Sequence, residues 1–278
     1  MNFSNLNSIA NYIVENGKGI LAADESNPTC KKRFDTISVE STEENRRDYR
    51  QLLFQAEGMS NNIGGVILFD ETIRQNTVDG TALVDLIKQK EALPGIKVDK
   101  GLAPFENSDI EKVTQGIEDL DARCAEYYKM GALFTKWRAV ISIGKTLPSQ
   151  GCIEENAKLL ARYAKIVQKN NMVPIVEPEV LMDGSHSVEE CYDATSRTLK
   201  SLFQNLEEEN VDITGTILKP NMVTPGTEHQ EKVGVETVAK ETLRCLHECV
   251  PDNLPAITFL SGGQSETVST EHLDTMNK

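Results

Sequence analysis

The sequence predicts a single α/β domain arranged as a (β/α)₈ barrel, with seven of the eight strands present in this chain. Three observations predict this fold class: seven short apolar segments, intervals between them that each fit a helix and two loops, and a length of 278 residues. Repeated βα units give a parallel sheet with right-handed crossovers, and one such barrel needs about 250 residues. The expected strands are residues 19–24, 64–69, 95–100, 133–138, 173–179, 213–222 and 256–261.

The stretch ITGTILKPNM at 213–222 shows how these strands are recognised. A run of β-branched and apolar residues bounded by polar residues and proline is typical of a buried strand. This run ends at Lys219, directly before Pro220. Because lysine is rarely fully buried without a partner, Lys219 is a candidate functional residue. The alternative is an ordinary strand end, where the ammonium group reaches water.

Helical periodicity fills the intervals between the strands. One helix is expected to begin at Ser41, because Ser41 and Glu44 have the spacing of a capping box. Gly131 is the expected C-terminal cap of the helix at 114–130. The other expected helices are 4–16, 83–89, 114–130, 154–170, 188–208, 235–250 and 265–276. No linker or low-complexity tract divides residues 1–278, and the chain stops within the seventh barrel helix.

Composition excludes several classes of function. The chain carries 29 basic and 43 acidic residues, for a formal charge of −14. Nucleic acids and anionic membranes both need a basic surface, so neither is an expected partner. The N-terminus has no signal-peptide pattern, and no apolar run approaches the roughly 20 residues that span a bilayer.

Cysteines and histidines indicate a cytoplasmic protein without a metal or other cofactor. The six cysteines form no CxxC pair, and the four histidines show no ligand spacing. Such cysteines are typical thiols of a reducing compartment, and zinc sites need closely spaced ligands. We therefore expect no metal site.

Charged residues at the strand ends predict an active site. In a barrel of this kind, the C-terminal ends of the strands converge on one mouth. Period-two spacing places the two members of each charged pair on one face of their strand. These pairs are Lys97 with Asp99, Lys136 with Arg138, and Glu177 with Glu179. Buried charges are costly unless they pair or bind a ligand, so the mouth is either an active site or a salt-bridged structural network.

Two features of this mouth indicate specific chemistry. Burial and a nearby Lys136 would both disfavour the charged form of Lys219 and leave a nucleophilic amine that forms an imine, with Glu177 moving protons. The segment SGGQSE, which begins at Ser261, lies where a strand gives way to a helix. Its Gly262 and Gly263 let backbone amides approach an anion, and phosphate sites recur after strands seven and eight.

Eight motifs carry a resemblance to a known family. They are GKGILAADES, EENRRDYRQLLF, GGVILFDET, PGIKVDKG, TKWR, PIVEPEVL, LKPNMVTPG and FLSGGQSE. In this order they resemble the class I fructose-1,6-bisphosphate aldolases, from about Gly17 to Lys278. The resemblance implies a TIM (β/α)₈ barrel, usually a homotetramer. It also implies metal-free cleavage of fructose 1,6-bisphosphate to dihydroxyacetone phosphate and glyceraldehyde 3-phosphate.

The same resemblance implies roles for individual residues. Lys219 is the expected Schiff-base lysine, Glu177 the general acid/base with Glu179 beside it, and Asp24 the carboxylate at the C4 hydroxyl. Lys136 is expected to hold substrate hydroxyls and balance charge. The expected phosphate-binding residues are Ser261, Gly262 and Gly263 at one end of the substrate, and Ser26, Thr29, Arg33, Lys97 and Arg138 at the other.

Two departures from the family pattern stand out. After Asp-Glu this chain reads Ser26-Asn27-Pro28-Thr29 where the better-known branch has Ser-Thr-Gly-Ser. Family members also continue for some eighty residues, which hold the eighth strand, a phosphate-binding arginine and a tyrosine-bearing tail. The sequence therefore predicts a C-terminally truncated aldolase. The alternatives are an inactive fragment, a non-catalytic scaffold with the same fold, and another lysine-imine enzyme such as a transaldolase.

Overall fold

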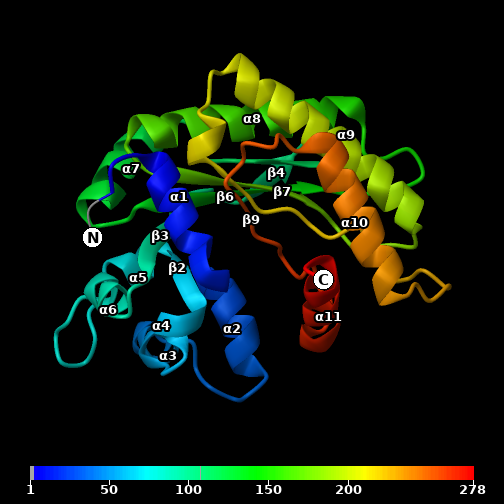
Figure 1. The fold of residues 1–278 in the computed structure, drawn as a ribbon. Helices are drawn as coiled ribbons and strands as arrows, with labels where there is room; N and C mark the ends of the chain where they lie inside the picture. Colours follow the sequence, from blue (N-terminus) through cyan, green and yellow to red (C-terminus); the bar gives the residue numbers. More distant parts are fainter. Residues whose placement is uncertain (1–2, 107) are drawn as a thin grey trace.

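The chain folds around a curled parallel sheet of seven strands, as expected for most of a (β/α)₈ barrel (Figure 1). A computed structural model describes residues 3–106 and 108–278. The strands pair in the order β1-β2-β3-β6-β7-β8-β9, each parallel to its neighbour. They are β1 Gly19–Ala23, β2 Ile63–Leu68, β3 Leu93–Lys97, β6 Phe134–Ile141, β7 Val173–Val180, β8 Ile217–Leu218 and β9 Ala256–Ile257. All seven predicted strands are confirmed, in chain order.

Strands β8 and β9 are shorter than the predicted 213–222 and 256–261. Residues Ile213–Gly215 form the short 3₁₀ helix η2 instead, because the Asp212 side chain accepts from the Thr214 amide at 3.0 Å. Pairing nevertheless continues beyond the strand bounds. The Lys219 amide donates to the Val176 carbonyl at 2.8 Å. The mouth residue is thus tied to β7 by its own backbone.

Helices cover the outside of the sheet. Helix α8 packs on β6 and β7, α9 packs beside it on β7, and α10 lies between α9 and α11 (Figure 1). The helices are α1 Leu6–Val14, α2 Asn27–Asp35, α3 Glu43–Gln55, α4 Met59–Asn62, α5 Asp70–Ile73, α6 Leu83–Gln89, α7 Leu120–Lys129, α8 Gln150–Lys169, α9 Val188–Glu208, α10 Val235–Cys249 and α11 Glu266–Met276, with the 3₁₀ helix η1 at Glu15–Gly17.

Two predicted helix starts are corrected, and helix α2 is an addition to the predicted helices. The N-cap of α3 is Thr42 rather than Ser41, because the Thr42 hydroxyl accepts from the Asn45 amide at 3.1 Å. Helix α7 begins at Leu120 rather than 114, because Lys112–Thr114 forms strand β5 with its partner β4, Leu102–Pro104. Helix α2 was not expected; a proline at its N-terminus favours a helix start there.

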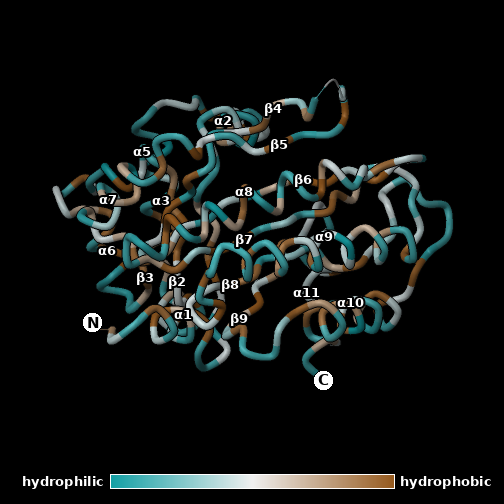
Figure 2. Tube along the Cα trace, turned by 90° about the horizontal axis from the view of Figure 1, so that it is seen from above, coloured by the Kyte–Doolittle hydropathy of each residue, from teal (hydrophilic) through white to brown (hydrophobic). Residues whose placement is uncertain are grey.

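Helix α1 closes the base of the sheet. It contacts β1, β2, β7 and β9, and in Figure 2 it lies opposite α2 and the β4–β5 hairpin. The approach is close enough that a Cβ on Gly64 would lie 1.9 Å from the Ile13 carbonyl oxygen. Glycine is therefore required at this point of contact. The apolar cluster at the base joins α1 to the strands and consists of Ile9, Ala10, Ile13, Ile67, Leu93, Phe134, Val173, Ile175, Ile217 and Ala256.

Strand alternation then places charged residues above this apolar base. Phe134, Ile175 and Ile217 belong to the base cluster. The residues two positions further along each chain are Lys136, Glu177 and Lys219, which share their face. The opposite faces carry Trp137, Val176 and Leu218 into the layer between sheet and helices. The inner face of the sheet is thus apolar at its base and charged at its mouth.

Candidate active site

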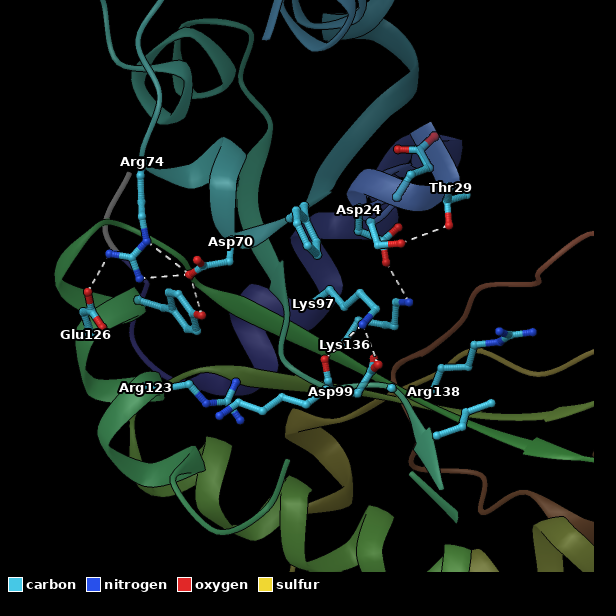
Figure 3. Close-up of a pocket in the computed structure, with 17 residues that line it drawn as sticks. Asp24, Thr29, Asp70, Arg74, Lys97, Asp99, Arg123, Glu126, Lys136 and Arg138 are labelled. Atoms are coloured by element: carbon cyan, nitrogen blue, oxygen red, sulfur yellow. Dashed lines mark hydrogen bonds and ion pairs between the residues drawn. The ribbon is translucent and has the colours of Figure 1, made fainter. Parts of the chain in front are cut away.

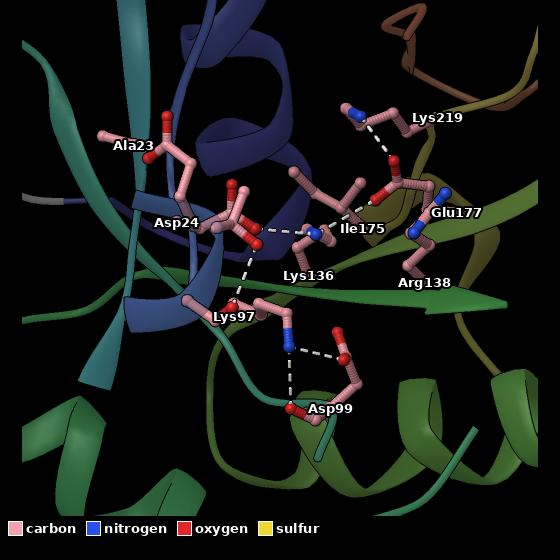
Figure 4. A network of polar contacts seen from close by, with 12 residues as sticks. Ala23, Asp24, Lys97, Asp99, Lys136, Arg138, Ile175, Glu177 and Lys219 are labelled. Carbon is pink, nitrogen blue, oxygen red and sulfur yellow. Dashed lines mark hydrogen bonds and ion pairs between the residues drawn. The ribbon is translucent and has the colours of Figure 1, made fainter. Parts of the chain in front are cut away.

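A line of four charged side chains of alternating sign crosses the mouth (Figure 4). Lys219 Nζ lies 2.6 Å from Glu177 Oε1. The other carboxylate oxygen of Glu177 lies 3.4 Å from Lys136 Nζ. Lys136 Nζ in turn lies 2.7 Å from Asp24 Oδ2. Four of the five predicted catalytic residues therefore form one contiguous group.

This line is largely shielded from solvent. The four side chains are between 4% and 12% exposed. Interactions between charges strengthen in such surroundings, because less water screens them. An ammonium group and a carboxylate in contact here can exchange a proton with a small change in solvation. The site has the parts that imine chemistry needs: a lysine amine and an adjacent proton donor and acceptor.

Lys136 is the cation in the middle of the line. Burial lowers its pKa, but the carboxylates of Glu177 and Asp24 raise it by more, so the net direction is upward from the ordinary value. Lys136 is therefore a fixed positive charge at neutral pH. Glu177 lies between Lys136 and Lys219 and contacts both.

Two further pairs flank the line. Lys97 Nζ lies 2.5 Å from Asp99 Oδ1 and 3.0 Å from the Asp99 carbonyl oxygen. Arg138 donates from Nε to Glu179 Oε2. Glu179, which was expected beside Glu177, is thus bound by Arg138. Burial lowers the pKa of Arg138 and Glu179 raises it by more, so Arg138 stays charged.

A cavity of about 840 Å³ opens beside these groups (Figure 3). Its wall includes Asp24 and Lys136 from the line. It also includes four of the predicted phosphate-binding residues, Ser26, Thr29, Lys97 and Arg138. Ser26 Oγ and Thr29 Oγ1 lie 3.0 Å apart, so the hydroxyl at position 29 lies within hydrogen-bond distance of its neighbour despite the altered loop sequence. The cavity has the size and the cations to take a small anionic molecule.

Comparisons with known proteins agree on one family. The model described as fructose-bisphosphate aldolase class-I matches residues 5–278. A probable fructose-bisphosphate aldolase class 1 from Xanthomonas campestris pv. campestris is 51% identical over 278 residues, which is 100% of this chain and 83% of that protein. The chain belongs to the class I fructose-bisphosphate aldolases.

Two other relatives extend this match. The cytosolic fructose-bisphosphate aldolase 5 of Arabidopsis thaliana is 52% identical over 269 residues, which cover 97% of this chain and 75% of that protein. A solved structure of the Plasmodium falciparum aldolase, in complex with TRAP and a small-molecule inhibitor, has a TM-score of 0.96 at 48% identity. The aligned residues make up 98% of this chain and 79% of the solved chain.

These matches identify the protein as a lyase of the aldolase class and agree with the predicted fold. The prediction of a truncated aldolase gains no support from them, because the family model matches nearly the whole chain.

In this aldolase, two groups of predicted phosphate-binding residues lie outside the cavity wall. Arg33 donates to Glu25 and to the Tyr49 hydroxyl, and its side chain is 58% exposed. Arg33 is thus paired with Glu25, which itself belongs to the cavity wall. Residues Ser261, Gly262 and Gly263 lie in the loop between β9 and α11, where Gly262 and Gly263 have φ angles of 63° and 97°.

That loop is nevertheless tied to the segment that carries Lys219. The Leu260 amide donates to the Pro220 carbonyl at 3.2 Å. The Gln264 amide donates to the Ser261 carbonyl at 3.1 Å, which closes the turn before α11. Glycine adopts these positive φ angles without steric strain.

The sequence pattern alone does not single out the buried arginines of the aldolase. Arg46, Arg50 and Phe54 lie on the buried face of α3. Their four-residue spacing is the available signal, because it aligns two arginines with an apolar residue on one helix face. The outer cavity wall, which includes Asp70, Arg74 and Arg123, was likewise not expected.

Neither a candidate metal site nor a membrane-spanning helix occurs in the described residues. Over residues 3–106 and 108–278, no group of three or more histidine, cysteine, aspartate or glutamate side chains could hold a metal ion. Within that same part of the chain, no helix is long and apolar enough to cross a bilayer. The expectation of a metal-free mechanism stays a prediction for experiment.

Proposed function

We propose that this aldolase cleaves fructose 1,6-bisphosphate to dihydroxyacetone phosphate and glyceraldehyde 3-phosphate through an imine on Lys219. The observation that carries the proposal is the 2.6 Å contact between Lys219 Nζ and Glu177 Oε1, inside a buried line that ends at Asp24. A nucleophilic lysine needs a neighbour that takes and returns protons, and Glu177 is in position to do so.

Imine formation uses the Lys219–Glu177 pair. The neutral Lys219 amine attacks the C2 carbonyl carbon of the sugar and gives a carbinolamine. Glu177 delivers a proton to the carbinolamine hydroxyl, water leaves, and the C–N double bond forms as an iminium ion. Lys136 stays charged throughout because Glu177 and Asp24 flank it, so it binds the substrate hydroxyls without supplying a proton.

Cleavage of the carbon–carbon bond uses Asp24. The Asp24 carboxylate accepts the proton of the C4 hydroxyl, the C3–C4 bond breaks, and its electron pair moves into the iminium to give an enamine. Glyceraldehyde 3-phosphate leaves. Protonation of the enamine at C3 and hydrolysis then release dihydroxyacetone phosphate and the free lysine.

The two phosphates need separate sites. We propose that one phosphate binds to Lys97, Arg138, Ser26 and Thr29, which share the wall of one cavity, with Arg33 reaching it after release from Glu25. The other phosphate binds to the Ser261–Gly262–Gly263 turn, where backbone amides and the N-terminus of α11 favour an anion. Glu179 holds Arg138 in place.

Trapping the intermediate tests this function. Borohydride reduction of the protein with dihydroxyacetone phosphate should fix one adduct, and peptide mapping should place it on Lys219. Lys219→Arg should give no adduct, whereas Lys165→Arg, on the exposed face of α8, should label like the unaltered protein. An adduct on another lysine would overturn the assignment of Lys219.

We further propose that this protein acts as a homotetramer in the cytoplasm. The resemblance to the family supports the tetramer, and the names of the cytosolic Arabidopsis thaliana relatives support the compartment. Sedimentation equilibrium of the purified protein tests the tetramer, since a monomer mass would reject it.

A further inference from the structure

Arg50 lies fully buried beneath the strand end that carries Asp24. It belongs to α3, and its side chain is 0% exposed. Its Nε donates to the Ala23 carbonyl oxygen at 3.1 Å, and its Nη2 donates to the Glu25 carbonyl oxygen at 2.6 Å. One guanidinium group thus binds the backbone on both sides of Asp24.

The location of these bonds matters because regular pairing ends just before Asp24. The register between β1 and β2 ends at Ala23, which lies opposite Leu68. Asp24 follows directly and projects its carboxylate to Lys136 at 2.7 Å. Hydrogen bonds between β1 and β2 fix the backbone up to Ala23. Beyond that point, the two hydrogen bonds from Arg50, here called the Arg50 fork, fix the backbone instead.

Two carboxylates, those of Glu25 and Glu71, lie near the charged guanidinium group of Arg50, and neither forms a close ion pair with it. Its Nη2 lies 3.9 Å from Glu25 Oε2, and its Nη1 lies 4.0 Å from Glu71 Oε1. Glu71 itself is bound by both Nε and Nη2 of Arg46, at 2.7 and 2.6 Å. These hydrogen bonds hold the pKa of Glu71 below its usual range, so Glu71 balances both arginines while Arg50 keeps its bonds for the carbonyls.

We propose that Arg50 is a positioning residue for Asp24: it fixes the backbone on both sides of Asp24 so that the carboxylate meets the C4 hydroxyl at the moment of bond cleavage. The inference rests on the proposed imine mechanism. The hydrogen bonds of Arg50 reach Ala23, Glu25 and the sulfur of Cys30, and none of them reaches Lys219 or Glu177. Imine formation at Lys219 is therefore independent of Arg50, whereas cleavage depends on it.

Two measurements on one set of variants separate these steps. The variants are Arg50→Met, which removes both bonds, and Arg50→Lys, which keeps the charge but loses the fork. The matched control is Arg47→Met on the same helix, because Arg47 pairs with the exposed Asp48 and Glu44. Borohydride trapping with dihydroxyacetone phosphate reports imine formation, and kcat and KM for fructose 1,6-bisphosphate report cleavage.

Both Arg50 variants should lower kcat by about 100-fold, the scale expected when a catalytic group is misplaced by about 1 Å. The trapping rate and KM should stay close to those of the unaltered protein. Arg47→Met should change neither reaction. If trapping and cleavage fall together in the Arg50 variants, Arg50 supports the fold in general and the proposal is wrong.

A double variant tests whether Arg50 acts through Asp24. Asp24→Asn alone should lower kcat, and adding Arg50→Met should cost no more, because the carboxylate that Arg50 positions is already gone. Independent, multiplicative losses would overturn the proposal. If Arg50→Met does not fold, Arg50→Lys carries the same cycle.

Chemical rescue provides a readout that a general loss of stability would not give. In Arg50→Ala, guanidinium ion, at concentrations well below those that unfold the protein, should occupy the vacated site and restore cleavage. Failure of rescue in a folded variant counts against the fork. Failure of the proposed function is distinct, since it appears as an adduct away from Lys219 or as full cleavage by Asp24→Asn.

Discussion

Single residues in the mouth depend on one another because each charge is balanced by its neighbours. Glu177 is shared between Lys219 at 2.6 Å and Lys136 at 3.4 Å, and Lys136 is shared between Glu177 and Asp24. Removing any one of these groups leaves a buried charge without its partner, which is costlier than losing an exposed pair. The cost of a substitution here therefore depends on which neighbouring charge loses its partner.

Glu177→Gln should separate proton transfer from binding. The amide keeps the shape and a hydrogen bond to Lys219 but cannot deliver a proton, so kcat should fall by about 10²–10⁴-fold. Steady-state kinetics measures the loss, and circular dichroism confirms that the variant is folded. A folded variant with unchanged kcat would remove Glu177 from the mechanism.

The raised pKa of Lys136 predicts how stability depends on pH. In the unfolded chain, a lysine has a pKa of about 10.4. In the folded protein the pKa of Lys136 is higher, because the carboxylates of Glu177 and Asp24 raise it by more than burial lowers it. A raised folded pKa gives stability that is fully present below the unfolded value and lost as pH rises through the folded value. Lys136→Met should thus lower the free energy of unfolding by about 3–5 kcal/mol near neutral pH.

Urea unfolding at a series of pH values checks this prediction. The gap between the unaltered protein and Lys136→Met should be largest near neutral pH and narrow above about pH 10.4, as the unaltered protein loses the contribution of Lys136. A gap that widens at alkaline pH would contradict the assignment of charges.

Elements differ in how far their sequences predict them. The seven strands were predictable because each is an apolar run bounded by turn residues, and the mouth residues because strand alternation fixes their face. Helix α7 was assigned too early a start because residues 112–114 pair with β4, a tertiary contact that periodicity does not report. The pairing of Arg33 with Glu25 was not predictable, because this partner is selected by the fold of the β1–α2 segment rather than by either residue type.

A substitution at Gly64 tests how closely helix α1 packs against the sheet. Gly64→Ala should drive α1 off β2, because the added Cβ would lie 1.9 Å from the Ile13 carbonyl oxygen, and overpacking of this kind costs about 1–3 kcal/mol. Gly19→Ala is the matched control, since no atom lies within 4 Å of its added Cβ. Thermal unfolding compares them, and equal melting temperatures would show that α1 is not held by this contact.

At the scale of the whole molecule, a net charge of −14 surrounds a cavity whose wall carries six cations beside five carboxylates. The acidic exterior keeps copies of the chain apart through mutual repulsion, whereas basic and acidic groups nearly balance in the cavity wall. The sequence pI is about 4.8, so solubility should pass through a minimum near that pH, where mutual repulsion vanishes. Light scattering across a pH series checks this, and a minimum near neutrality would show that exposed apolar surface dominates.

Chelation tests the chemistry of the whole chain. The described residues contain no group that could hold a metal ion, and the proposed reaction uses an amine and carboxylates alone. Cleavage by protein treated with EDTA should proceed at the untreated rate. Loss of activity that added zinc restores would reject the imine mechanism.

The contact between α1 and the base of the sheet sets the order in which the molecule can be completed during synthesis. Ile9 leaves the ribosome early, yet its cluster includes Ala256, and α1 touches β9 itself. At about 5–20 residues per second, the intervening chain takes roughly 12–50 s to translate. Until β9 is made, the apolar face of α1 has only part of its binding surface, so α1 becomes fully packed long after it is translated.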